Sequence, residues 1–262
     1  MLSRILYEDK DIIVAYKPAG LPVQTARVGQ PDMVSELKNH LCRARDGKDT
    51  SAGRGEPYLG IVHRLDQPVE GILVFAKNRA AAASLTGQLR AQGDNGGFCK
   101  RYYAIVCGEP TAREGRLEDY LYKQAVKNGK HMDYRSIIDN QNHPEGRRGQ
   151  HSSAAGEDEK AVLAVLEYSI LETKEEQGLA LADICLHTGR FHQIRAQMAH
   201  AGMPLLGDRK YGGPEARALA AARGIQNVAL CAYRLGFVHP LSGEETGFRI
   251  KPENPAFSSF TL

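Results

Sequence analysis

The chain has 262 residues, and 42% of them are hydrophobic, enough to bury a sizeable core. Its net charge of +3 is too small to indicate a nucleic-acid partner by itself, and the five scattered cysteines lack the spacing of a zinc or redox motif. We therefore expect a cytoplasmic globular protein with free thiols, no signal peptide and no membrane span.

Short apolar runs separated by turns dominate the first half of the chain. Expected strands there are, in order, residues 5–7, 12–16, 71–76 and 102–106. Lys17–Gly20 is expected to form a turn, and residues 35–41 a helix. Asn78 suits the N-cap of a second helix, because Ala81 and Leu85 follow it at helical spacing.

The second half adds strands and one helix. Expected strands are residues 162–171, 179–186 and 229–237. A helix is expected over 191–201, with Gly202 as its stop. Two polar stretches, 43–57 and 127–160, predict mobile loops. Strands and helices do not alternate regularly, and this favours an α+β fold.

Charged residues stand out in two places. Arg64 and Asp66 lie between two apolar segments. Burying a charge there costs free energy, so such residues are usually paired with an opposite charge or belong to a functional site. From residue 190 to 210 the charged residues are four bases and one acid: Arg190, Arg195, Arg209, Lys210 and Asp208. Such a local patch can bind phosphate even in a nearly neutral chain.

Several motifs follow one another in a specific order. They are Lys17–Leu21, His63-Arg64-Leu65-Asp66, Gly71–Asn78, Lys100–Val106, Leu186–Asp208 and Leu235–Glu244. In this order and spacing the chain resembles the RluA branch of the RluA/RsuA family of RNA pseudouridine synthases. The resemblance extends from residue 5 to about residue 248.

The resemblance implies a mixed, mostly antiparallel central sheet flanked by helices, with a basic RNA-binding cleft. It implies a single catalytic domain over 1–262 without an N-terminal S4-type RNA-binding module. The family converts selected uridines in RNA to pseudouridine and needs no metal or organic cofactor. We therefore expect a monomer that acts on structured rRNA or tRNA.

The resemblance also assigns catalytic roles. Asp66 matches the catalytic aspartate, which acts on the ribose as nucleophile or as base, and Arg195 matches the arginine that pairs with it. The alternative is a structural buried ion pair. Tyr102 matches the tyrosine that stacks on the target base, whereas Tyr103 is expected on the opposite face of the strand.

Four further residues are candidates for substrate binding. Arg64 resembles the arginine that fills the gap left by the flipped uridine; the alternative is a phosphate contact or an ion pair. Arg190 and His192 are expected to contact phosphate or line the cleft, with helix capping as the alternative, and Ile194 accompanies them in the same motif. His63 is expected to be structural.

The chain departs from the family pattern near these motifs. Val69 and Glu70 replace the usual Thr-Ser, and we expect Glu70 to point away from the cleft. Phe191 replaces a frequent threonine, and Met203 a frequent histidine. The alternative function is a non-catalytic RNA-binding or RNA-folding protein on the same fold. A nucleotide-binding enzyme is disfavoured, because no Gly-rich phosphate loop lies between a strand and a helix.

Overall fold

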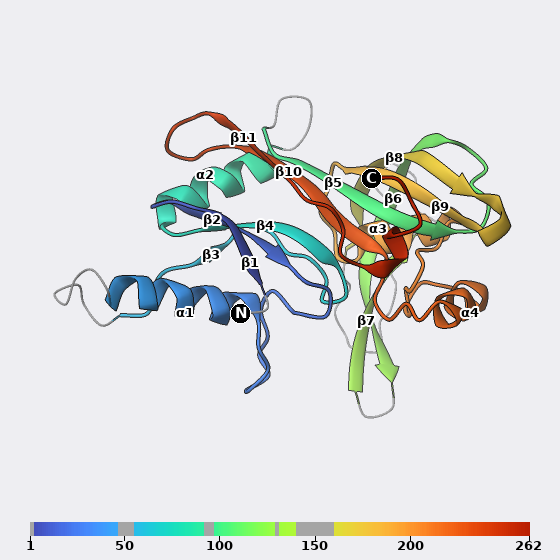
Figure 1. The fold of residues 1–262 in the computed structure, drawn as a ribbon, viewed down its shortest axis with the longest axis horizontal. Coiled ribbons are helices and arrows are strands. Elements are labelled where there is room, and N and C mark those ends of the chain that lie inside the picture. Colours follow the sequence, from blue (N-terminus) through green and yellow to red (C-terminus); the bar gives the residue numbers. More distant parts are fainter. Residues whose placement is uncertain (1–2, 47–54, 92–96, 129–130, 140–159) are drawn as a thin grey trace. The chain divides into compact units, whose positions relative to one another are not determined.

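A computed structural model describes residues 3–46, 55–91, 97–128, 131–139 and 160–262 (Figure 1). These residues divide into two compact units. Unit 1 comprises residues 1–101, 230–257 and 262, and unit 2 comprises residues 102–229 and 258–261. Strand β5(Cys99–Cys107) carries the chain from unit 1 into unit 2.

Unit 1 is built on a mixed sheet with the strand order β1-β2-β4-β10. Its elements are β1(Arg4–Glu8), β2(Ile12–Lys17), α1(Met33–Asp46), β3(Gly60–Ile61), β4(Glu70–Ala76), α2(Arg79–Arg90), β10(Leu230–Val238), β11(Glu245–Arg249) and a 3₁₀ turn, Pro255–Phe257. Strands β4 and β10 run parallel, whereas β1–β2, β2–β4, β3–β4 and β10–β11 are antiparallel. The central strands β2 and β4 are buried along their whole length, as their continuous apolar sequences predict.

Helix α2 packs on this sheet through Ala81 and Leu85, which join the same buried cluster as Val74 and Phe237. Asn78 caps the helix, because its side-chain oxygen accepts a hydrogen bond from the Ala81 N–H at 2.8 Å. The predicted N-cap is therefore confirmed.

Gly71 is required where β4 meets β10. Its φ is +140°, and a Cβ there would lie 2.6 Å from the backbone nitrogen of Ala232, its partner in the parallel pair. Any other residue would both strain the backbone and separate the two strands.

Unit 2 holds a second stretch of sheet with the order β5-β9-β8-β6-β7. Its further elements are β6(Glu114–Asn128), β7(His131–Ile138), β8(Val162–Lys174), a 3₁₀ turn Glu175–Gln177, β9(Leu179–Leu186), α3(Gln193–His200) and α4(Pro214–Ala222). The pairs β6–β7, β6–β8 and β8–β9 are antiparallel. Ala196 of α3 packs on Leu121 and Ala164 of this sheet.

Most expected elements are present, and the α+β prediction is confirmed. The prediction of a loop over 127–160 is wrong at its start, because β6 extends to Asn128 and β7 spans His131–Ile138. The loop expected at 43–57 is likewise helical up to Asp46. Residues 47–54 and 140–159 lie outside the described residues.

Two elements differ in extent or were not expected. Helix α3 begins at Gln193, two residues later than expected, because His192 takes a left-handed conformation. Helix α4 was not expected from its alanine-rich sequence. In the described part of the chain, no helix is long and apolar enough to cross a membrane.

Candidate active site

Asp66 lies in unit 1, in the loop that leads from β3 to β4, and its side chain is half-buried. Its carbonyl oxygen accepts a hydrogen bond from Val69 N–H at 3.0 Å, and this bond closes a turn just before β4. Leu65 and Val69 on either side are buried. The carboxylate is thus carried by a short loop anchored by apolar side chains at both ends.

Lys17 holds this loop from the end of β2. Its side chain is fully buried, and its ammonium donates hydrogen bonds to three carbonyl oxygens: Leu21 at 2.7 Å, Gln67 at 3.0 Å and Pro18 at 3.1 Å. Gly20 N–H adds a hydrogen bond to the Gln67 carbonyl at 2.8 Å, and the Gln67 amide returns one to the Gly20 carbonyl. The backbone that follows Asp66 is therefore tied to the Lys17–Gly20 turn.

Two nearby carboxylates act on the charge of Lys17. Burial lowers the pKa of Lys17 to about 7, while the negative charges of Asp66 and Glu70 act in the opposite direction. Lys17 is thus close enough to Asp66 for their charges to interact, a role that the sequence did not suggest.

The side chain of Glu70 is buried within unit 1. Its carboxylate is 2% exposed and accepts hydrogen bonds from the Tyr16 hydroxyl at 2.7 Å and from the backbone N–H groups of Glu253 and Asn254, both at 3.0 Å. A residue that departs from the family pattern therefore fastens the C-terminal segment to β4.

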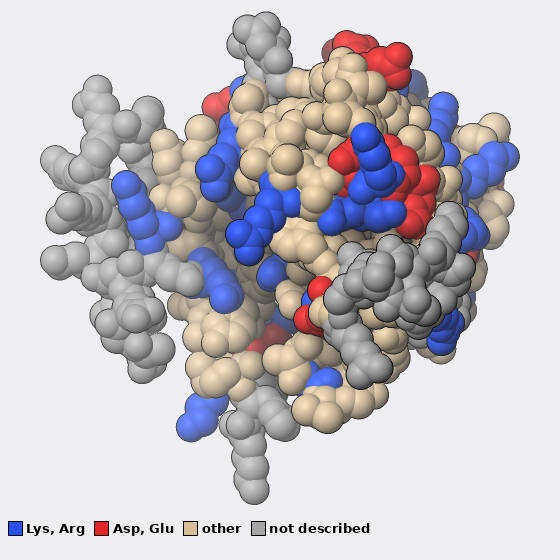
Figure 2. Space-filling view, turned by 90° about the vertical axis from the view of Figure 1, so that its left-hand side faces the viewer, with Lys and Arg blue, Asp and Glu red and all other residues tan. Residues whose placement is uncertain are grey.

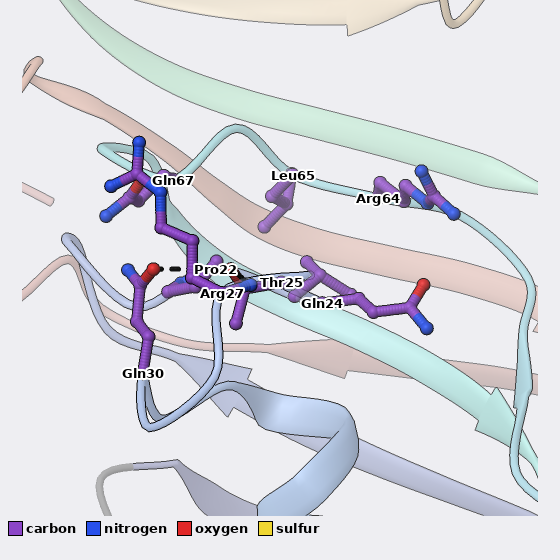
Figure 3. Close-up of a pocket in the computed structure, with 9 residues that line it drawn as sticks. Pro22, Gln24, Thr25, Arg27, Gln30, Arg64, Leu65 and Gln67 are labelled. Carbon is purple, nitrogen blue, oxygen red and sulfur yellow. Dashed lines mark hydrogen bonds between the residues drawn. The ribbon is translucent and has the colours of Figure 1, made fainter.

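Arg64 is exposed and lines a pocket beside the Asp66 loop (Figure 3). The pocket has a volume of about 330 Å³ and is lined by Pro22, Val23, Gln24, Thr25, Arg27, Gln30, Arg64, Leu65 and Gln67. Figure 3 shows Arg64 and Gln24 at one end and Arg27 extending toward Gln67 at the other. Two guanidinium groups and several side-chain amides make this a polar, cationic cavity.

His63 is structural, in agreement with its expected role. Its Nε2 accepts a hydrogen bond from Val74 N–H at 3.3 Å, and its ring meets Phe98 edge-on with centroids 5.5 Å apart. Burial, assisted by the charge of Lys100, lowers the pKa of His63 to about 3. The ring is therefore neutral at physiological pH and serves as an acceptor within the sheet.

Arg195 lies in unit 2, on α3, and forms a bidentate pair with Asp208. Its Nε donates to Asp208 Oδ2 at 2.7 Å and its Nη2 donates to Oδ1 at 2.8 Å, with both side chains almost fully buried. The guanidinium lies 5.2 Å from the ring centroid of Tyr211. Burial alone would raise the pKa of Asp208, but Arg195 and the N–H groups of Lys210 and Tyr211 hold it below its usual value.

The residues just before α3 are fixed by local hydrogen bonds. The Arg190 side chain is exposed, and its Nε donates to the Leu163 carbonyl at 2.9 Å. Nδ1 of His192 lies 2.8 Å from the hydroxyl of Tyr211, and Ile194 is buried. Their expected substrate contacts remain predictions.

Tyr102 and Tyr103 are neighbours on β5, and each is only 5% exposed. Alternation along the strand places them on opposite faces.

Figure 2 shows one face of the molecule, where Lys and Arg side chains lie as separate groups among uncharged surface, and several acidic side chains gather beside basic ones.

The candidate residues thus fall into two sets. Asp66 and Arg64 belong to unit 1, whereas Tyr102 and Arg195 belong to unit 2, so their expected assembly remains a prediction. Lys17 and Asp208 were not expected as parts of the site. The signal for Asp208 was present, because it is the one acid within a basic stretch.

Comparisons with known proteins identify the class. The model of the RNA pseudouridylate synthase family matches residues 11–200. The chain is 33% identical over 252 residues to an uncharacterized RNA pseudouridine synthase of Aquifex aeolicus, covering 94% of this chain and 68% of that protein. It is also 33% identical to ribosomal large subunit pseudouridine synthase D of Zymomonas mobilis, covering 93% and 67%.

A solved structure supports the fold. Human RNA Pseudouridylate Synthase Domain Containing 4 matches with a TM-score of 0.67 at 22% identity, over 95% of this chain and 89% of that one. The chain therefore belongs to the RNA pseudouridine synthases, isomerases that convert uridine in RNA to pseudouridine. Its substrate is RNA.

Proposed function

We propose that this chain isomerises a specific uridine in structured RNA, with Asp66 as the catalytic carboxylate. The observation that carries the proposal is the Asp66 loop itself. The loop is braced by buried Lys17 and opens beside a cationic pocket, inside the segment that the family matches. A fixed carboxylate next to donors for phosphate and base is what a reaction at the ribose of a bound nucleotide requires.

Arg195 is the proposed counter-ion of Asp66, and Tyr102 the proposed stacking partner of the uracil. The pair with Asp208 takes the Nε–Nη2 edge of Arg195. A guanidinium carries five N–H donors, and the pair with Asp208 accounts for two of them. In this proposal both units contribute to one catalytic domain, in keeping with relatives that match over more than 90% of the chain.

Arg64 is the proposed residue that occupies the gap left by the flipped uridine. Its exposed side chain on the pocket rim suits contact with RNA. Ribosomal RNA of the large subunit is the first RNA to test, because relatives carry that substrate in their names. The five free cysteines are typical of a protein that functions in a reducing compartment such as the cytoplasm.

Pseudouridine mapping of total RNA tests this function. Cells that lack the protein should lose pseudouridine at one or a few positions of rRNA or tRNA. Wild type and the exposed control variant Glu109→Gln should restore it, whereas Asp66→Asn should not. Restoration by Asp66→Asn would refute the catalytic role, and identical maps with and without the protein would favour a non-catalytic RNA-binding protein.

A further inference from the structure

Three large apolar side chains of unit 2 are exposed in one region. Met132 is 53%, Tyr134 42% and Phe191 41% exposed. Met132 and Tyr134 lie on β7, and Phe191 lies just before α3. Side chains of this size are normally buried, so a group of them at the surface suggests a binding surface.

The strand register places these residues on one face together with two lysines. In the β6–β7 hairpin, Lys127 lies opposite Met132, Ala125 opposite Tyr134, and Lys123 opposite Ser136. Alternate residues share a face, so Lys123, Lys127, Met132, Tyr134 and Ser136 all point the same way. The Ser136 hydroxyl donates a hydrogen bond to the Phe191 carbonyl, which brings Phe191 to this face as well. We call Lys123, Lys127, Met132, Tyr134 and Phe191 the hairpin face.

Lys123 links the two rings of the hairpin face. Its ammonium lies 4.1 Å from the ring centroid of Tyr134 and 5.6 Å from that of Phe191. Lys123 and Lys127 are both exposed. The neighbouring acid, Asp133, is paired with Lys210 at 2.5 Å. The face is therefore aromatic and positively charged.

Phe191 is held rigidly at this face. Its ring stacks on the imidazole of buried His192 at 3.7 Å between centroids and 22° between planes. Among the described residues, His192 is the one non-glycine with a positive φ, 52°. The Tyr211 hydroxyl lies 2.8 Å from His192 Nδ1 and accepts a hydrogen bond from Ser136 N–H at 2.7 Å. A strained residue braced in this way typically marks a functional site.

We propose that the hairpin face binds an unpaired segment of the substrate RNA, with nucleobases stacking on Phe191 and Tyr134 and phosphates near Lys123 and Lys127. Aromatic rings accept any base by stacking, and lysines contact the backbone. The positive charge favours RNA over an apolar protein partner. The inference rests on the proposed function only in taking RNA as the ligand.

Equilibrium binding of two labelled probes tests the proposal: a single-stranded oligouridine and a blunt RNA duplex of equal length. Phe191→Ala and Tyr134→Ala should each weaken oligouridine binding about tenfold or more, and Phe191→Trp should bind like wild type. Duplex binding should change little. Leu171→Ala removes an equally exposed apolar side chain elsewhere in unit 2 and should bind both probes normally.

Unchanged oligouridine binding by both alanine variants, with thermal unfolding like that of wild type, would overturn the proposal. So would an equal loss for the duplex. Unchanged RNA binding combined with lost self-association would mark a protein interface instead. The test measures oligouridine binding and not pseudouridine formation, so a failure of the hairpin face is distinguishable from a failure of catalysis.

Discussion

The two regions that carry the proposed catalytic residues hold buried charge in different ways. In unit 1, buried Lys17 directs its ammonium at backbone carbonyls and so fixes the course of the Asp66 loop. In unit 2, buried Arg195 meets a carboxylate, Asp208, in a bidentate pair. The first arrangement positions a loop, whereas the second orients a guanidinium. Both place a charged side chain without relying on solvent-exposed contacts.

Asp208→Asn should have the largest effect on stability, because it disrupts the buried pair of unit 2. The amide keeps the shape of the side chain but leaves the Arg195 charge buried without its counter-ion, so the free energy of unfolding should fall by about 3–5 kcal/mol in urea denaturation. Arg116→Gln is the matched control, because it removes an exposed pair with Glu118 and Glu167 and should change little. Equal effects of the two variants would show that the buried pair is not specially stabilising.

Lys17→Met tests the unit 1 arrangement. The variant removes the Lys17 donor from the Pro18 and Leu21 carbonyls, while the Gln67 carbonyl keeps Gly20 N–H, so the free energy of unfolding should fall by about 2–3 kcal/mol. Hydrogen exchange should accelerate at the amides of Gly20 and Val69, which close this loop. The Phe75 amide within β4 serves as the internal control. Unchanged exchange at Gly20 and Val69 would mean that Lys17 does not hold the loop.

The contribution of His63 to the free energy of unfolding should depend on pH. In the unfolded chain, His63 takes up a proton as the pH falls below its ordinary pKa of 6.5, whereas in the folded protein it does so only near pH 3. The free energy of unfolding therefore falls as the pH falls from 6.5 towards 3. Between pH 7 and pH 5 the loss from this residue should be about 2 kcal/mol. His63→Gln, measured by urea unfolding at both values, should lack that part of the pH dependence. The same pH dependence in variant and wild type would contradict a half-buried histidine that stays neutral in the folded protein.

Local sequence patterns predicted much of the fold. Continuous apolar runs identified β2 and β4, and Asn78 identified the start of α2. The β6–β7 hairpin was missed because its strands are polar and expose many side chains, so they carry little hydrophobic periodicity. The start of α3 shifted because the αL conformation of His192 depends on tertiary contacts with Tyr211.

Motif order proposed the candidate site residues, which remain predictions, but it did not indicate their hydrogen-bond partners. Motif order pointed to Asp66, Tyr102 and Arg195, yet nothing in the local sequence indicates that Lys17 reaches the Gln67 carbonyl, 50 residues away. Likewise, Phe191 was visible only as an unusual residue in a motif. Its role at an exposed aromatic face emerged from the hairpin register and from contacts with Ser136 and His192.

The central claim is that Asp66 is the catalytic carboxylate, and the most direct test measures binding and product formation on one RNA. Purified wild type, Asp66→Asn and Glu109→Gln are mixed with a transcript that carries the mapped uridine. Asp66→Asn should bind this RNA like wild type but form pseudouridine about a thousandfold more slowly, or not at all. Product formation by Asp66→Asn at a rate close to that of wild type and Glu109→Gln would contradict the account.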